Sequence, residues 1–255
     1  MKNGFDELTA LYYIWKRDLI RFVRAKSRIV GSLGMPFFLL AALGMGMNVP
    51  LNVGGNSVNY LQFIAPGILA MVLLFGSVFS GVNVIVDRQF GFLKETLVAP
   101  VGRTTTVIGK SMGGATTAMI QGILMLIIAM VIGVSINWMI LPVAILLMIL
   151  ISMAFVSLGI AIASTMEDMH GFQLIMNFMI MPMFFLSGAL FPLSNAPKIV
   201  QYISYINPMT YAVEALRFLF MGYAEIPFPI SVGVLIGFFV VATLAAVYLF
   251  NKIEE

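Results

Sequence analysis

The 255-residue sequence contains no cysteine and a single histidine, His170. The absence of cysteine excludes disulfides, thiolate catalysis and cysteine-ligated metal sites. His170 stands close to Glu167 and Asp168 and has no second histidine to work with. We therefore interpret it as a residue of an interfacial turn rather than as a catalytic base or a metal ligand.

Charged residues are also scarce, because they make up 10% of the sequence, whereas soluble domains carry roughly 25%. Hydrophobic residues make up 61%, and the mean hydropathy is +1.03. A water-soluble fold could not bury this much apolar surface. The composition predicts an all-α integral membrane protein of the cell membrane, with residues 1–255 forming a single transmembrane domain.

Asp, Glu, Lys and Arg are absent from three long stretches, residues 29–86, 111–166 and 169–197. A helix needs about 20 residues to cross the hydrocarbon core, and polar or Gly/Pro-containing breaks divide the longer stretches. Together with a last apolar run, they predict six transmembrane helices. These are placed at about residues 29–47, 61–86, 111–134, 139–163, 172–189 and 230–250.

The basic residues are distributed unevenly along this pattern. With six spans, twelve of the 14 Lys and Arg residues lie on one side of the membrane, and only Lys198 and Arg217 lie on the other. Because loops rich in Lys and Arg stay in the cytoplasm, both termini are predicted to be cytoplasmic.

Residues 5–28 follow a different pattern, in which apolar side chains recur every three or four residues and basic ones lie mostly opposite. This predicts an amphipathic helix at the membrane interface, with its basic face toward anionic lipid headgroups. A helix that only anchors the chain is the alternative. The residues singled out on this helix are Trp15, Lys16, Arg17, Arg21 and Arg24.

Two segments outside the predicted spans are informative. Within residues 87–103, a short helix from about Gly91 to Val98 would place Leu93 and Leu97 on one face, which suits docking to a soluble partner. A plain connector at headgroup level is the alternative. Residues 190–229 are too apolar for an ordinary outer loop, and they predict short helices that dip part-way into the outer leaflet.

Motifs for chemistry are incomplete. Residues 104–111 nearly match a phosphate-binding loop, but Thr104 stands where the first glycine is needed and no buried strand precedes it. No pattern for intramembrane hydrolysis is present, and no predicted span clearly contains an ionisable group of the kind that marks ion pathways. We expect a transport protein that is not an enzyme, with no catalytic, cofactor-binding or metal-binding residue and no nucleic acid partner.

The predicted fifth span is rich in methionine and is flanked by Phe184 and Phe185. Adaptable thioethers and aromatic rings can contact varied hydrophobic molecules, although ordinary core or lipid contact is the simpler explanation for each residue. The possible pathway-lining residues are Met176, Asn177, Met183 and Phe184.

Two groups of residues, in order along the chain, resemble the membrane subunits of type-2 ABC exporters, especially the daunorubicin-resistance-like permeases. The resemblance covers nearly the whole chain. The first group comprises Asp87, Arg88, Gly91, Glu95, Leu97, residues 100–103, Gly109 and Lys110, and the second comprises residues 186–192, Pro197, Asn207, Pro208, Tyr211 and residues 214–217.

This resemblance implies a dimer with a second copy of this or a similar permease, and a separate cytoplasmic ABC ATPase that holds ATP and Mg. The segment 87–103 would be the coupling helix that docks on the ATPase, and the N-terminal helix would border it. The outer segment would form re-entrant helices that close the exit. The implied docking residues are Arg88, Gly91, Leu93, Lys94, Glu95, Leu97, Pro100 and Arg103, and the implied gate residues are Phe191, Pro192, Asn207, Pro208, Tyr211, Glu214 and Arg217.

The expected function is therefore ATP-driven export, from the cytoplasm or the inner leaflet, of a hydrophobic or amphipathic small molecule that is drug-like or lipid-like. A permease for polysaccharides or lipid-linked glycans is one alternative. An independent channel or ion-coupled carrier is the other.

Overall fold

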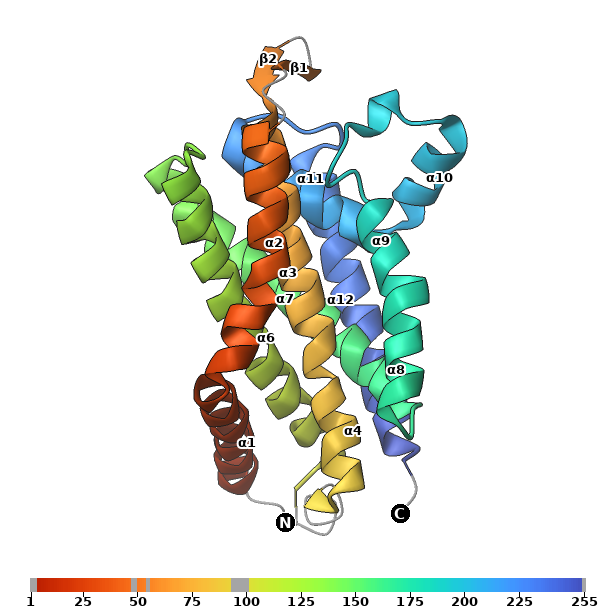
Figure 1. Cartoon of the computed structure of the whole chain (residues 1–255). Helices are drawn as coiled ribbons and strands as arrows, with labels where there is room; N and C mark the ends of the chain where they lie inside the picture. Colours follow the sequence, from red (N-terminus) through yellow and green to blue (C-terminus); the bar gives the residue numbers. More distant parts are fainter. Residues whose placement is uncertain (1–3, 47–49, 54–55, 93–100, 254–255) are drawn as a thin grey trace.

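The computed structural model describes residues 4–46, 50–53, 56–92 and 101–253, and in these ranges the chain is almost entirely helical. Long helices stand side by side in an up-and-down bundle (Figure 1). The helices are α1 (Gly4–Arg24), α2 (Lys26–Gly46), α3 (Tyr60–Ser80), α4 (Val82–Gln89), α6 (Arg103–Ile132), η1 (Trp138–Ile140), α7 (Leu141–Ser164), α8 (Met169–Ile175), the π-helical turn η2 (Met176–Ile180), α9 (Met181–Phe185), η3 (Leu193–Asn195), α10 (Lys198–Ile206), α11 (Pro208–Met221) and α12 (Phe228–Asn251).

Polar residues and glycine set the helix ends. Asn59 and Asp168 cap α3 and α8 by accepting hydrogen bonds from backbone N–H groups of the first turn. Gly133 ends α6 in a left-handed conformation with φ 116°, which glycine adopts without steric cost. The strands β1 (Pro50–Val53) and β2 (Asn56–Asn59) form an antiparallel hairpin before α3.

The core lies around α3, which is the most buried of the five long apolar segments, while α2 and α12 are the least buried of these five. The end of α3 and α7 approach each other closely because glycines meet there. A Cβ on Gly81 would lie 2.3 Å from the backbone oxygen of Gly159, and one on Gly159 would lie 2.6 Å from that of Val78. Contact between backbones at this distance requires the small residues.

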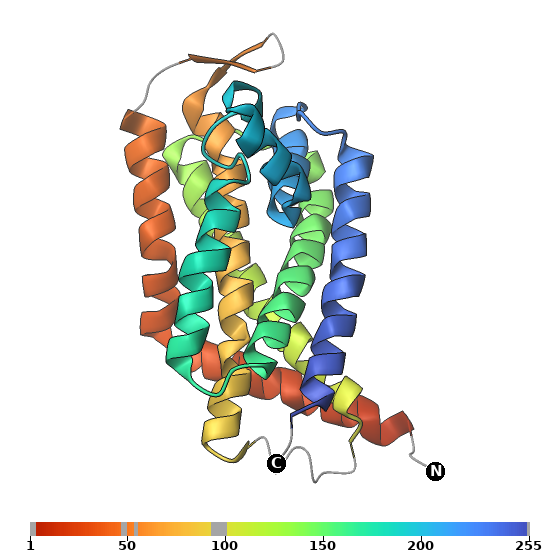
Figure 2. The ribbon, with the colours of Figure 1, turned by 90° about the vertical axis from the view of Figure 1, so that its right-hand side faces the viewer.

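The two ends of the bundle differ. At one end α1 lies across the base, close to α4 and the start of α6 (Figure 2). At the other end lie the hairpin, α10 and α11 (Figures 1 and 2). Thus α1 and the C-terminal end of α12 lie at one end of the bundle, and the segment between α9 and α12 lies at the opposite end.

Five helical segments of the described chain are long and apolar enough to cross a membrane, and each coincides with an expected span. The expected span at residues 172–189 is instead a shorter apolar helix, Met169–Phe185. Its end comes earlier because the chain turns after Phe185, and Gly188 adopts φ 74°. The structure therefore confirms five spans and not the sixth.

The third expected span begins earlier than residue 111, because α6 starts at Arg103. Lys110, assigned to a cytoplasmic loop by its charge, is instead a helical residue that is only 4% exposed. A lysine can be buried this deeply when its charge is paired, and its partner is part of the site described next.

Candidate functional site

A buried ion cluster joins α1, α4 and α6 at the end of the bundle where α1 lies. Its centre is the Asp87 carboxylate, which is 1% exposed. Arg17 Nη2 donates to Asp87 Oδ2 at 2.8 Å, Arg21 Nη1 donates to Oδ1 at 3.4 Å, and the Lys110 ammonium donates to Oδ2. One carboxylate thus holds three cations, two of them from the N-terminal helix.

Small residues on α6 let α1 reach this cluster. A Cβ on Gly109 would lie 3.1 Å from Ile14 Cβ, and one on Gly113 would lie 2.9 Å from Asp18 Cβ. Farther along α6, Trp15 Nε1 donates to Thr116 Oγ1 at 3.0 Å. The small-x-x-x-small spacing of residues 109–113 therefore serves helix packing.

Asp18 is the unusual member of this region. It is 5% exposed, yet its Oδ1 has no hydrogen-bond donor within the described residues. The nearest cationic atom in an ion pair with it is Arg17 Nη2 at 3.5 Å, and that atom lies closer to Asp87. Burial raises the pKa of the Asp18 carboxyl and the Asp87 charge adds to the rise, although Lys110 and Arg17 oppose it.

The raised pKa predicts that Asp18 lowers stability at neutral pH. Below the ordinary value of 3.8 the folded and unfolded carboxyls are both protonated, so the effect is absent, and it grows as the pH rises through the folded-state pKa. Asp18→Asn should therefore melt at a higher temperature than the unmodified protein at pH 7.5. About 1 kcal/mol corresponds to roughly 2–4 °C for a chain of this size, and a rise of that order is expected.

The measurement is the difference in melting temperature between the two proteins from pH 4 to pH 8. The difference should be small at pH 4 and reach a plateau at neutral pH. Glu167→Gln serves as the control, because that side chain is 85% exposed. A difference that is constant across the range would contradict the assignment.

A cavity of about 520 Å³ lies beside Asp18, between α1, α2, α3, α4, α6 and the α8–α9 segment. This volume is in the range of small-molecule sites. Its lining residues are Asp18, Arg21, Phe22, Gly31, Ser32, Met35, Pro36, Met71, Val72, Phe75, Gly76, Phe79, Ser80, Asn83, Gly113, Gly114, Thr117, Gln121, Gln173, Met176, Asn177 and Met181.

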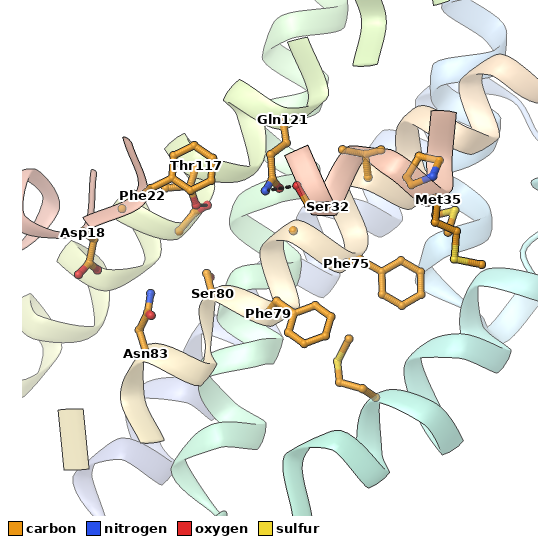
Figure 3. A pocket seen from close by; sticks show the side chains of 18 of the residues that line it. Asp18, Phe22, Ser32, Met35, Phe75, Phe79, Ser80, Asn83, Thr117 and Gln121 are labelled. Carbon is orange, nitrogen blue, oxygen red and sulfur yellow. Dashed lines mark hydrogen bonds between the residues drawn. The ribbon is translucent and has the colours of Figure 1, made fainter. Parts of the chain in front are cut away.

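The cavity is polar at one end and apolar at the other (Figure 3). Asp18 and Asn83 lie at the polar end, whereas Phe75 and Met35 lie at the far end. Between them, Gln121 Nε2 donates to Ser32 Oγ at 2.9 Å. A molecule that fills the cavity would therefore meet hydrogen-bonding groups at one end and aromatic and thioether groups at the other.

The π-helical turn η2 shapes one wall. The Met181 N–H donates to the carbonyl of Met176, five residues earlier, and both side chains line the cavity together with Asn177. Such turns are frequent at functional sites. Of the four predicted pathway residues, Met176 and Asn177 thus reach the cavity, while Phe184 is buried against the rings of Phe75 and Phe185 and Met183 packs against the core.

A second buried ion pair lies at the opposite end, within α11. Glu214 and Arg217 are 0% and 1% exposed and pair with each other. Arg217 Nη2 also donates to the carbonyl of Gly188 at 2.8 Å, and its guanidinium lies 4.0 Å from the centre of the Phe63 ring. Glu214 Oε2 accepts hydrogen bonds from the backbone of Glu225 at 2.6 Å and Ile226 at 3.3 Å.

The other predicted gate residues mostly support the same helix. Asn207 caps α11 through Met209 N–H and donates to the carbonyl of Met183 at 2.6 Å, while Pro208 is the first residue of the helix. Tyr211 donates to the carbonyl of Tyr205. Pro192 is buried before η3, and Phe191 is exposed.

Three of the predicted docking residues lie at the base of the bundle. Arg88 reaches the turn between α7 and α8, where it contacts the Met166 carbonyl at 3.4 Å. Arg103 Nη1 donates to the carbonyl of Asn251 at 2.6 Å. Gly91 adopts φ 78°, which favours glycine. The predicted coupling residues Leu93, Lys94, Glu95, Leu97 and Pro100 lie outside the described residues.

The residues predicted on the N-terminal helix divide into two groups. Trp15, Arg17 and Arg21 face the protein and make the contacts given above, whereas Arg24 is exposed and Lys16 lies over the Tyr12 ring. The sequence reasoning missed Asp18. The available signal was an acidic residue between the basic residues Arg17 and Arg21 of this helix.

Within the described ranges, no group of three or more His, Asp and Glu residues is placed to hold a metal ion. The segment resembling a phosphate-binding loop belongs to α6 from its first turn onward. Its backbone N–H groups, beyond the first turn, are therefore engaged within the helix.

Comparison with known proteins defines the class. The model of the ABC-2 type transporter family matches residues 9–221, and the chain belongs to this family. It is a multi-pass membrane protein and a transport permease subunit by relationship, rather than an enzyme.

Individual relatives agree with this class. The chain is 28% identical to the putative transport permease ycf38 of Cyanophora paradoxa, over 86% of this chain and 76% of the relative. It is 27% identical to nodulation protein J of Rhizobium leguminosarum bv. viciae, over 94% and 93%. It is 26% identical to the inner membrane transport permease YadH of Escherichia coli, over 91% and 90%.

Proposed function

We propose that this chain is the membrane subunit of an ATP-driven exporter, in which a separate cytoplasmic ABC ATPase supplies the driving force. The observation that carries the proposal is the family match over residues 9–221. The helical course of residues 104–111 supports it, because that segment is not arranged as a phosphate-binding loop. ATP and Mg would then be held by the partner.

The ATPase docks at the base of the bundle, on the segment 87–103 and beside α1. Arg88 and Arg103 tie the two ends of this segment to the α7–α8 turn and to the end of α12. Asp87 ties its start to α1 and α6. A displacement of this segment by the ATPase would therefore be transmitted to α1, α6, α12 and the α7–α8 turn through hydrogen bonds and ion pairs.

In this proposal six spans cross the membrane, with the α8–α9 segment as the short fifth, and both termini lie in the cytoplasm. The outer surface of α1 carries exposed apolar side chains, among them Tyr13 and Val23, which fits a helix at the lipid interface. At the other end α10 and α11 are re-entrant helices that close the exit, and two such subunits form a dimer.

The substrate is an amphipathic small molecule, drug-like or lipid-like, rather than a long polar chain. The cavity supports this choice because it is lined by six helical segments, has a mainly apolar wall and is polar at one end. A polysaccharide or lipid-linked glycan remains the competing substrate class on the resemblance to this family.

The docking proposal is tested by co-purification with the ATPase. Replacing both Glu95 and Leu97 with Ala should reduce recovery of the ATPase at least tenfold, because charge and apolar surface are lost from one short element. The control is the double replacement of Lys198 and Tyr202 with Ala, since both are exposed on α10 at the opposite end. Unchanged association of the Glu95/Leu97 variant would refute the docking site.

A further inference from the structure

Asp18 lines the cavity with a carboxylate whose Oδ1 accepts no hydrogen bond from the residues that the structure describes. Its side chain is 5% exposed, its Oδ1 lacks a donor within the described part of the chain, and the residue lines the cavity. A buried carboxylate without donors is costly. Such a group in a cavity wall therefore points to a ligand that supplies the donor.

The neighbouring cations do not meet this need, because their closest carboxylate is Asp87. Arg17 lies 2.8 Å from Asp87 and 3.5 Å from Asp18, and Arg21 and Lys110 pair with Asp87. Asn83 adds an amide at the same end of the cavity (Figure 3). The polar end thus presents the Asp18 carboxylate and the Asn83 amide, while Arg21, which also lines the cavity, pairs with Asp87.

The rest of the wall fixes the form of the ligand. Beyond Ser32 and Gln121, which bond to each other, the cavity continues between Phe75, Phe79, Met35 and Met176. Aromatic and thioether side chains attract apolar and aromatic groups without demanding one shape. The opposite ends therefore select a molecule with one donor-bearing head and one apolar body.

We infer that this cavity binds an amphipathic amine, whose ammonium group donates to Asp18 and whose apolar body lies against Phe75 and Phe79. The inference rests on the proposed transport function, to which it adds the substrate class and the recognising residue. A charge-assisted hydrogen bond in a desolvated site contributes more than a neutral one, so the positive head is the feature that Asp18 distinguishes.

The test measures binding of dansylcadaverine, a fluorescent amine with an aromatic body, to the full chain in lipid nanodiscs without ATP. Two probes with the same body serve as comparisons, N-acetyl-dansylcadaverine, which is neutral, and dansyl-6-aminohexanoate, which is anionic. The amine should bind best, and Asp18→Asn should weaken it about tenfold or more while leaving the acetylated probe unchanged.

Two glycines of α2 provide a matched pair for the cavity itself. Gly31 lines the cavity and Gly34 does not, and an added Cβ would meet nothing within 4 Å at either position. Gly31→Leu should therefore fill part of the cavity and weaken the amine about tenfold or more. Gly34→Leu, on the same helix, should bind like the unmodified protein.

Three results would overturn the inference: amine affinity unchanged in Asp18→Asn, amine affinity unchanged in Gly31→Leu, or tighter binding of the anionic probe than of the amine. Because binding is measured without the ATPase, its loss is distinguishable from failure of the transport proposal. If the protein binds the ATPase but not the amine, the amine site is contradicted and the transport proposal is not. If it binds the amine but no ATPase, the transport proposal is contradicted and the amine site is not.

Discussion

Asp87→Asn is expected to lower the stability of the folded protein by about 3–5 kcal/mol, the usual cost of removing one partner of a buried ion pair. The Lys110 ammonium is 4% exposed and depends on Asp87 for its opposite charge. Arg17 and Arg21 lose the same acceptor, so α1 loses its ionic attachment to α4. Thermal melting of the purified protein should show a fall of about 10 °C or more.

Two further variants separate this effect from a general loss of charge. Glu167→Gln removes an exposed carboxylate that lies 3.9 Å from Arg88, and exposed pairs contribute about 0–1 kcal/mol. Its melting temperature should stay close to that of the unmodified protein. Asp87→Asn combined with Lys110→Met should recover much of the loss, because the unpaired cation is gone. A single Asp87→Asn variant that melts normally would contradict the cluster.

Arg217→Met is expected to release α11 from the end of α9. The substitution leaves the Glu214 carboxylate buried without its cation and removes the bond to the Gly188 carbonyl and the contact with Phe63. The loss in stability should again be about 3–5 kcal/mol. We expect the segment between α9 and α12 to open before the rest of the protein unfolds, because this ion pair holds that segment in place.

The absence of native cysteine makes this release measurable. Ser187 is fully buried next to Gly188, so a single cysteine introduced as Ser187→Cys should react slowly with a maleimide. Adding Arg217→Met should speed the labelling at least tenfold. Lys198→Met is the control, because it removes an exposed cation from the same segment. Equal labelling in the presence and absence of Arg217 would show that the pair does not hold this segment.

Much of the bundle was predictable because its signals are local. Long apolar runs without charge favour buried or membrane helices, and five of the predicted spans coincide with helices of spanning length. The short fifth helix was not predicted at its true length, because the apolar run continues through Ala189 although the chain turns after Phe185. Hydrophobicity alone predicts neither that turn nor the π-helical turn η2.

The ion clusters were not predictable in the same way, because they join distant positions. Asp87 contacts Arg17, which lies 70 residues earlier, and the charge pattern predicted only that both lie at the same end of the bundle. Glu214 and Arg217 stand three residues apart on one helix, which indicates a pair. Their burial, however, depends on Gly188 and Phe63, which come from other elements.

The cavity required the three-dimensional arrangement as well. Met176 and Asn177 were correctly singled out as candidates by the composition of their helix, yet Asp18 comes from the N-terminal helix and Gly31 from α2. In the sequence, nothing about any one of these four residues indicates a cavity. Only their convergence in the folded protein defines a cavity with one polar end.

We expect this permease to move its substrate only when a partner hydrolyses ATP. The most direct measurement reconstitutes the chain in proteoliposomes with and without the ABC ATPase that co-purifies with it, and follows transport of the fluorescent amine. The account predicts accumulation that needs ATP, the ATPase and an intact segment 87–103. Accumulation by the chain alone, without ATPase or ATP, would contradict it.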